Sequence, residues 1–314
     1  MILAGIQLLH IPDGFLSLPV SIACWLVTLA LLTAAVRRTR DLFDERLAPL
    51  AGIMAAFIFA AQMLNFPVAG GTSGHMIGGT LAAIALGPWV GMLVMTAVIT
   101  LQALLFQDGG LVVMGANILN MGLLSVLVGY GLYRGVAGRS PRVRMVVTAV
   151  AAWLSVMAGA LSTSLQLWLS GASSLSVVIP AMLGVHALIG IGEALITVAA
   201  LSFIVRARPE LLQENQERNG RAWVVPGLLI ALAVVLLSPL AASDPDGLES
   251  VAMELGFFNA KLGTPYELMP AYTLPFLGQS SLSTIAAGLV GALAVAAAAT
   301  ILVRVLRRRA KANT

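Results

Sequence analysis

The sequence predicts an all-α integral membrane protein with about nine helical spans, an extracytoplasmic N-terminus and a cytoplasmic C-terminus. Hydrophobic residues make up 59% of the 314 residues and charged residues only 10%, which lies outside the range of soluble domains. Apolar runs of about 20 residues, the length that crosses a hydrocarbon core of about 30 Å as a helix, recur along the chain. These runs do not alternate apolar and polar residues, which argues against a β-barrel.

Nine apolar runs, taken in order, are the expected spans, and the basic residues between them give their orientation. All 18 Lys and Arg residues except Lys261 fall in the loops that follow odd-numbered runs. By the positive-inside rule those loops are cytoplasmic, so the N-terminus lies outside. The runs cover about residues 17–36, 47–65, 76–86, 89–106, 111–133, 145–169, 177–205, 224–240 and 283–303.

The chain is expected to consist of a short leader and two modules. Residues 1–8 are a leader or a mis-assigned start, residues 9–221 form the first module, and residues 222–314 form a second, two-span module. The outer loop of the second module, 241–281, contains four prolines, which make a long helix improbable. Its acidic residues could attract cations by charge alone, as any solvated acidic loop would; those of interest are Asp244, Asp246 and Glu249.

Two of the three histidines lie on the predicted outer side. His10 belongs to a compact polar turn before the first run, and His75 ends a glycine-rich segment. If the functional chain began at Leu9, its amine, the amide nitrogen of His10 and Nδ1 of His10 would form fused chelate rings, with His75 adding a fourth nitrogen. Four nitrogens in a plane suit Ni(II), and imidazole also suits cobalt. Asp13 follows the chelate and is expected to orient it.

Other readings of the polar residues remain open. The glycines before His75 would also let helices pack closely. A hydrolase that uses Ser73 and His75 is disfavoured for two reasons. Residues two apart do not face each other on a helix, and no acidic residue that could orient the histidine stands nearby. His186 and Glu193 are seven residues apart, hence on one helix face. An interhelical hydrogen-bond pair is favoured there over a transport role.

Four motifs resemble the CbiM/NikM family of substrate-binding membrane subunits of energy-coupling-factor transporters for cobalt and nickel. They are HIPDGFL at 10–16, GTSGH at 71–75, GAN at 115–117 with NMG at 120–122, and IGIGEA at 189–194. The resemblance covers residues 9–205 and implies that Leu9, His10 and His75 bind the metal. The residues expected to support these ligands are Asp13, Thr72, Ser73, Asn117 and Asn120.

The N-terminus departs from the family pattern. In the family the histidine is the second residue of the mature chain, whereas here eight residues precede Leu9. A peptide amide in place of a free amine would be a much poorer ligand. The expectation is therefore that a leucine codon at residue 9 serves as the start, or that the leader is trimmed.

The pentapeptide PDGLE at 245–249, between two spans, is similar to the NikN/CbiN-like accessory subunit, which implies a fused accessory module. The expected function is capture of Ni(II) or Co(II) from the outer side of the plasma membrane of a prokaryote. The ion is the substrate, and we expect no permanently bound cofactor, no catalysis and no nucleic-acid binding. No Gly-x-x-x-x-Gly-Lys-Ser/Thr segment is present, so this chain does not hydrolyse ATP. The resemblance implies a membrane coupling subunit and ATPase subunits as partners. The alternatives are a secondary carrier using His186 and Glu193, or a non-transporting membrane scaffold.

Overall fold

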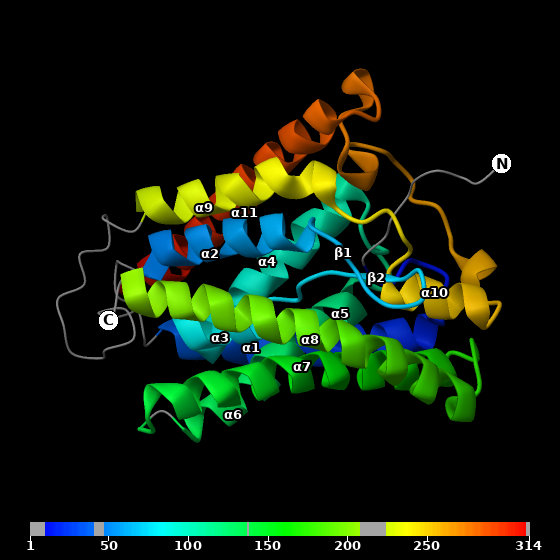
Figure 1. Ribbon diagram of the computed structural model, residues 1–314, viewed down its shortest axis with the longest axis horizontal. Helices are drawn as coiled ribbons and strands as arrows, with labels where there is room; N and C mark the ends of the chain where they lie inside the picture. The colour runs from blue at the N-terminus through cyan, green and yellow to red at the C-terminus, as the bar shows by residue number, and fades with distance from the viewer. Residues whose placement is uncertain (1–9, 41–46, 137, 208–223, 312–314) are drawn as a thin grey trace.

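The computed structural model describes residues 10–40, 47–136, 138–207 and 224–311, and shows a bundle of helices with two very short strands (Figure 1). The first module comprises α1 (Leu18–Arg40), α2 (Leu47–Gln62), β1 (Phe66–Pro67), β2 (Ser73–Gly74), α3 (Gly79–Leu86), α4 (Pro88–Phe106), α5 (Met114–Asn117), the π-helix η1 (Ile118–Leu124), α6 (Ser125–Arg134), α7 (Pro141–Leu169) and α8 (Leu175–Ala207). The second comprises α9 (Val224–Leu237), η3 (Ser238–Leu240), α10 (Gly247–Glu254), η4 (Phe258–Ala260), η5 (Pro270–Tyr272), η6 (Pro275–Leu277) and α11 (Ser281–Lys311).

Six helices of the described chain are long and apolar enough to cross a membrane. Five are α1, α4, α7, α8 and α11, and the sixth is the continuous helix Met114–Arg134, which contains η1. Two further apolar helices, Leu47–Gln62 and Val225–Leu240, are shorter. The protein is therefore a multi-pass membrane protein.

The third expected span, at residues 76–86, does not fold as one helix. Only Gly79–Leu86 is helical, and these eight residues reach about 12 Å at 1.5 Å per residue, far less than the hydrocarbon thickness. Residues 75–78, between β2 and α3, have no regular secondary structure. Gly78, at φ +85 immediately before α3, takes a left-handed conformation that glycine adopts readily.

The two modules share one apolar core. Helix α2 packs between α9 and α11 (Figure 1), and twelve of its 16 residues are buried. Small residues allow these backbones to approach closely, as in other membrane helix pairs: a Cβ on Gly291 would lie 2.1 Å from the Phe59 ring, and one on Gly52 would lie 2.8 Å from the carbonyl oxygen of Ala296. The second module is thus embedded in the bundle.

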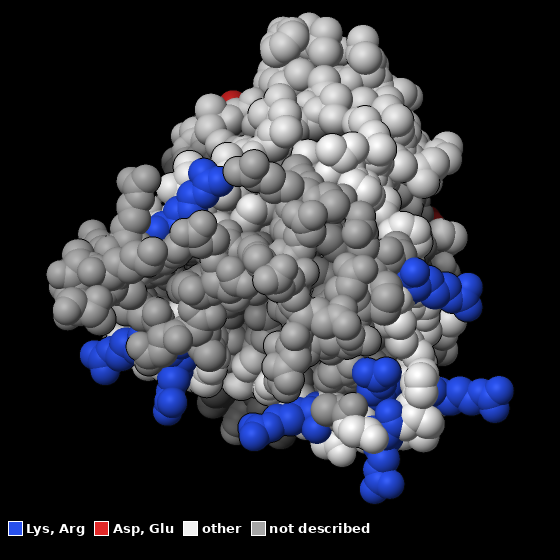
Figure 2. Space-filling view, turned by 90° about the vertical axis from the view of Figure 1, so that its left-hand side faces the viewer, with Lys and Arg blue, Asp and Glu red and all other residues white. Residues whose placement is uncertain are grey.

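The two ends of the bundle differ in charge. One end carries the described arginines of the loops and helix termini, and Figure 2 shows their side chains around its rim. The opposite end holds the turn before α1, the two strands, the Asp108 turn and the loop containing α10 (Figure 1). The residues at the basic end include Arg37, Arg38, Arg134, Arg139, Arg142, Arg144 and Arg206.

Candidate metal-binding site

The turn that carries His10 is fixed to the helix that begins at α5. The backbone N–H of Ile11 donates to Oδ1 of Asn117, and the carbonyl oxygen of Ile11 accepts from Nδ2 of the same side chain, both at 3.0 Å. The N–H of Gly110 donates to that carbonyl oxygen as well, at 2.9 Å. Asn117, predicted to support the ligands, therefore positions the residue directly after His10.

Asp13 secures the same turn through backbone groups. Its carboxylate accepts hydrogen bonds from the N–H groups of Leu111 at 2.9 Å, Val112 at 2.9 Å and Val113 at 3.1 Å. The N–H groups at a helix start have no partner within the helix, so a carboxylate there satisfies them. Asp13 thus acts on His10 through the backbone that both share.

The imidazole of His10 is held by a buried carboxylate. Nδ1 of His10 lies 2.7 Å from Oδ1 of Asp108, and Tyr272 of the second module donates its hydroxyl to Oδ2 of Asp108. Burial alone would raise the pKa of Asp108, but the charge of His10 and the hydrogen bonds from His10 and Tyr272 lower it, and the net direction is down. With Nδ1 turned to Asp108, the buried Nε2 of His10 has no hydrogen-bond partner among the described residues.

His75 lies beside His10, immediately after β2. The centroids of the two rings are 5.9 Å apart. Nδ1 of His75 lies 3.0 Å from the carbonyl oxygen of Met76; a neutral ring that donates there keeps its lone pair on Nε2. Histidines that bind metals commonly have one nitrogen oriented in this way.

Glu193 fixes the backbone that follows His75. Its carboxylate accepts from the N–H groups of Ile77 at 2.6 Å and Gly78 at 2.9 Å. The predicted pairing of Glu193 with His186 is therefore not formed: Nδ1 of His186 lies 2.8 Å from the carbonyl oxygen of Met182, one turn earlier in α8. The two side chains share one face of α8, but only Glu193 forms hydrogen bonds with the segment that carries His75.

The second module covers the His75 segment. The backbone N–H of Ser73 donates to the carbonyl oxygen of Pro245 at 2.8 Å, and the Ser73 hydroxyl donates to the carbonyl oxygen of Asp244 at 2.7 Å. The Thr72 hydroxyl donates to that of Ser250 at 3.0 Å. Thr72 and Ser73, predicted to support the ligands directly, instead bind the loop of the second module.

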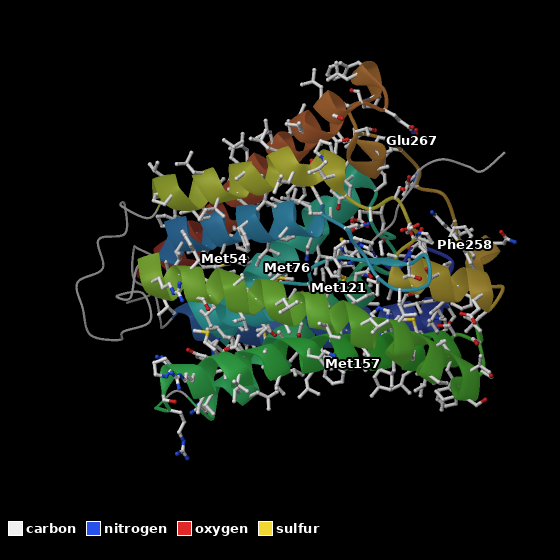
Figure 3. All side chains as sticks on the ribbon, in the orientation of Figure 1. Met54, Met76, Met121, Met157, Phe258 and Glu267 are labelled. Carbon is white, nitrogen blue, oxygen red and sulfur yellow. The ribbon has the colours of Figure 1, made fainter. Side chains whose placement is uncertain are left out.

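A cavity of about 70 Å³ lies beneath this loop. All three histidines line it, together with Asp246 and Gly247 from the second module, and Met121 on its wall lies inside the bundle in Figure 3. In the described part of the chain no three His, Cys, Asp or Glu side chains are gathered closely enough to form a ready-made metal cluster. The three histidines therefore line one cavity, but in this conformation their side chains are not close enough to bind one ion together.

Asn120 lies on the opposite wall of the cavity, in η1. Its amide bonds Thr163 at 3.1 Å and Gln166 at 2.8 Å, both on α7, and its Oδ1 accepts from Ser162 at 2.7 Å. These hydrogen bonds occupy the donor and acceptor atoms of the Asn120 amide, so this side chain forms part of the cavity wall. π-Helical turns are frequent at functional sites, and this one places Asn120 and Met121 beside the histidines.

The less favoured interpretation of the acidic segment, a solvated loop, does not hold for two of its three acidic residues. Asp246 and Glu249 are only 6% and 5% exposed. Asp246 caps α10, because its Oδ1 accepts from the backbone N–H of Glu249 at 2.7 Å. Burial and the nearby charge of Glu249 raise the pKa of Asp246 well above its usual value. Asp244 contributes its backbone carbonyl to Ser73.

Sequence reasoning missed Asp108 and Tyr272 as parts of the site. The available signal was the Gln107–Gly110 turn, in which an aspartate precedes two glycines between apolar runs. Gly109 has φ +96, and a Cβ there would lie 2.9 Å from Cβ of His10. Only glycine allows this turn to approach His10. Tyr272 gave no local signal, because it meets Asp108 across 164 residues of chain.

The fold and the site describe a multi-pass membrane protein in which three histidines line one small cavity. Comparison with known proteins gives its family. The family model described as cobalt uptake substrate-specific transmembrane region matches residues 10–211, and the PDGLE domain matches residues 221–308. The chain belongs to this cobalt-uptake family and carries a fused PDGLE domain, as the motifs predicted.

Individual relatives agree with this assignment. A putative fused nickel transport protein NikMN of Archaeoglobus fulgidus is 37% identical over 95% of this chain and 99% of the relative. A cobalt transport protein CbiM of Geobacter sulfurreducens is 32% identical over 68% of this chain and 64% of the relative. A crystal structure of a transition metal transporter matches with a TM-score of 0.58 and 34% identity, covering 64% of this chain and 94% of that structure.

Proposed function

We propose that this chain is the substrate-capture subunit of an ATP-driven importer of nickel or cobalt, and that His10 and His75 hold the ion. The convergence of these two imidazoles on one cavity supports the proposal. Their ring centroids are 5.9 Å apart, and an ion about 2 Å from one nitrogen of each ring fits between rings at that spacing. Relatives named as nickel or cobalt transport proteins identify the cargo class.

The remaining ligands would come from the backbone at His10. Two imidazoles leave two positions of a four-nitrogen site open, and the amide nitrogen of His10 and the amine of Leu9 would fill them. Leu9 lies outside the described residues. In this chelate Nδ1 of His10 binds the ion, so the ring must exchange its contact with Asp108 for the metal.

The charge distribution supports an orientation in the membrane with the cavity outside. The arginines of the described chain lie at the far end of the bundle (Figure 2), which the positive-inside rule assigns to the cytoplasm. The nine expected crossings then include residues 75–78, which have no regular secondary structure, together with α3 as one traverse. We further propose that a coupling subunit and ATPase subunits engage this basic end, because the chain contains no phosphate-binding loop of its own.

A secondary carrier is the less favoured function. It would require His186 and Glu193 to relay protons, but both oxygens of Glu193 are bonded to the backbone N–H groups of Ile77 and Gly78. A scaffold without transport gives no reason for two imidazoles to line one cavity with their ring centroids 5.9 Å apart.

The test is nickel and cobalt binding by the purified full-length protein, together with uptake by cells that contain the whole transporter. His10→Ala and His75→Ala should each lower affinity by about 100-fold or more and abolish uptake, since each removes a ligand. Leu188→Ala, on the outward face of α8 and 43% exposed, is the control. N-terminal sequencing of the same sample should find Leu9, or a methionine at that position, as the first residue. Full binding in both histidine variants would rule the proposal out.

A further inference from the structure

The third histidine of the chain faces the same cavity as His10 and His75. His186 lies on α8, inside a helix long enough to span the membrane, whereas His10 and His75 lie in loops at its outer end. The backbone of Gly247, in the second module, lies across the cavity from His186. A Cβ on Gly247 would lie 3.1 Å from Cε1 of His186. The loop of the second module thus closes the cavity directly over this ring.

The ring of His186 is prepared to bind a cation. Its Nδ1 lies 2.8 Å from the carbonyl oxygen of Met182, so Nδ1 carries the proton and donates it. The neutral ring then has its lone pair on Nε2. A histidine anchored through one nitrogen by a backbone carbonyl is typical of metal ligands, and polar groups within membrane spans commonly mark ion pathways.

Helix α8 is mechanically joined to the segment that carries His75. Glu193, two turns after His186, binds the N–H groups of Ile77 and Gly78. One turn after His186, Ile189 packs so closely on Gly74 that a Cβ on this glycine would lie 2.7 Å from its side chain. A displacement of α8 would therefore move His186 and the His75 segment together.

From these contacts we infer that His186 is a transfer ligand, which takes the ion from the His10–His75 pair when it leaves the capture site. The three rings line one cavity but each is held by a different oxygen atom, which favours successive binding. The cavity of about 70 Å³ exceeds the roughly 10–15 Å³ that one water molecule needs, so it has room for an ion that retains part of its hydration. In the step itself a bond from Nε2 of His186 to the ion forms as a bond to a capture-site nitrogen breaks, and the ion stays divalent.

This inference rests on the proposed function, and its test separates capture from transfer. His186→Gln removes the ligand while keeping a polar side chain of similar size. Leu195→Ala, on the same helix but 67% exposed and outside the cavity lining, is the control. Nickel binding is measured on the purified full-length protein, and initial uptake of radioactive nickel is measured in cells with the complete transporter. For His186→Gln we expect binding within threefold of the wild type and uptake reduced at least tenfold; Leu195→Ala should resemble the wild type in both.

Rescue distinguishes a ligand from a structural role. His186→Cys supplies a different metal-binding atom, so its uptake should exceed that of His186→Gln; thermal unfolding of both variants monitors folding. Uptake unchanged in His186→Gln, or no gain with cysteine, would overturn the transfer role. Loss of binding equal to that of His75→Ala would instead place His186 in the capture site and also overturn it. If His75→Ala keeps full binding, the proposed capture function itself fails, whatever His186 does.

Discussion

The two modules contribute different things to one site. The first supplies all three histidines of the chain, and it holds each by an oxygen atom near Nδ1: Asp108 for His10, Met76 for His75 and Met182 for His186. The second module supplies no histidine. It contributes the Tyr272 hydroxyl on Asp108, backbone carbonyls on Ser73, and a glycine over the cavity.

If the proposed function holds, ligation and coverage of the site are separate tasks. The imidazoles would provide the binding chemistry, whereas coverage depends on backbone contacts between the two modules. Because the second module is anchored beside α2 by α9 and α11, its outer loop is held at the cavity without a metal ligand of its own. Changes in the second module should therefore lower nickel affinity and stability by less than loss of a histidine does.

The largest effect from the second module is expected for Gly247→Val. A Cβ at this position would lie 2.8 Å from Cδ1 of Ile189 and 3.1 Å from Cε1 of His186, so the loop must move away from the cavity. We expect nickel affinity to fall by about 10- to 100-fold, as for other losses of support around a metal site. Gly263→Val is the control, because nothing lies within 4 Å of a Cβ there. Equal affinities for the two variants would show that the loop does not enclose the site.

Removal of the Glu193 carboxylate should destabilise the first module. Glu193→Ala leaves the buried N–H groups of Ile77 and Gly78 without their acceptor, at a cost of about 1–3 kcal/mol each. Glu193→Gln keeps one acceptor oxygen and should lose less. Unfolding of the two variants in detergent, followed by circular dichroism, measures the difference. A Glu193→Ala protein as stable as the wild type would mean that these bonds do not fix the His75 segment.

Asp13→Ala tests the attachment of the His10 turn. The change removes the acceptor for three backbone N–H groups, and the loss of such a cap costs about 1–2 kcal/mol. Thermal unfolding should shift down, and nickel affinity should fall with it because His10 shares this turn. Ser17→Ala is a nearby control. The account is contradicted if stability falls while nickel affinity is unchanged.

The smallest effect on nickel affinity is expected for Tyr272→Phe, because no proposed ligand changes. This change removes the hydroxyl that donates to Asp108 and accepts from Nε2 of Gln102, and one hydrogen bond to a charged group is worth about 1.5–3 kcal/mol. A double-mutant cycle with Asp108→Asn, read out as nickel affinity, isolates the link. The two changes should be non-additive. Additive effects would show that Tyr272 acts elsewhere.

Much of the helical architecture could be predicted, because the length of an apolar run fixes a spanning helix. α1, α4, α7, α8 and α11 lie close to their predicted runs. The short α3 could not be predicted, because composition does not report that Gly78 turns the chain at φ +85 and that the residues between β2 and Gly78 are not helical. The π-helix around Asn120 has the same apolar composition as an ordinary helix, so it too was missed.

The parts of the site that could be predicted are those that follow from residue type and from the side of the membrane on which a segment is expected. His10 and His75 were placed on one side by the charge distribution, and the structure brings their rings to 5.9 Å. Asp108, Tyr272 and the contact of Ser73 with Pro245 depend on pairings across more than 160 residues. Backbone hydrogen bonds of this kind leave no pattern in the side chains, which is why Thr72 and Ser73 were predicted near the metal but not as partners of the second module.

The central claim, that His10 and His75 hold the transported ion, is tested most directly by X-ray absorption spectroscopy of the nickel-loaded full-length protein. The account predicts a nitrogen-only, four-coordinate planar site with two imidazoles, reduced to one imidazole in His75→Ala if any metal remains. A nickel site without imidazole scattering, or one that His75→Ala leaves unchanged, would contradict it.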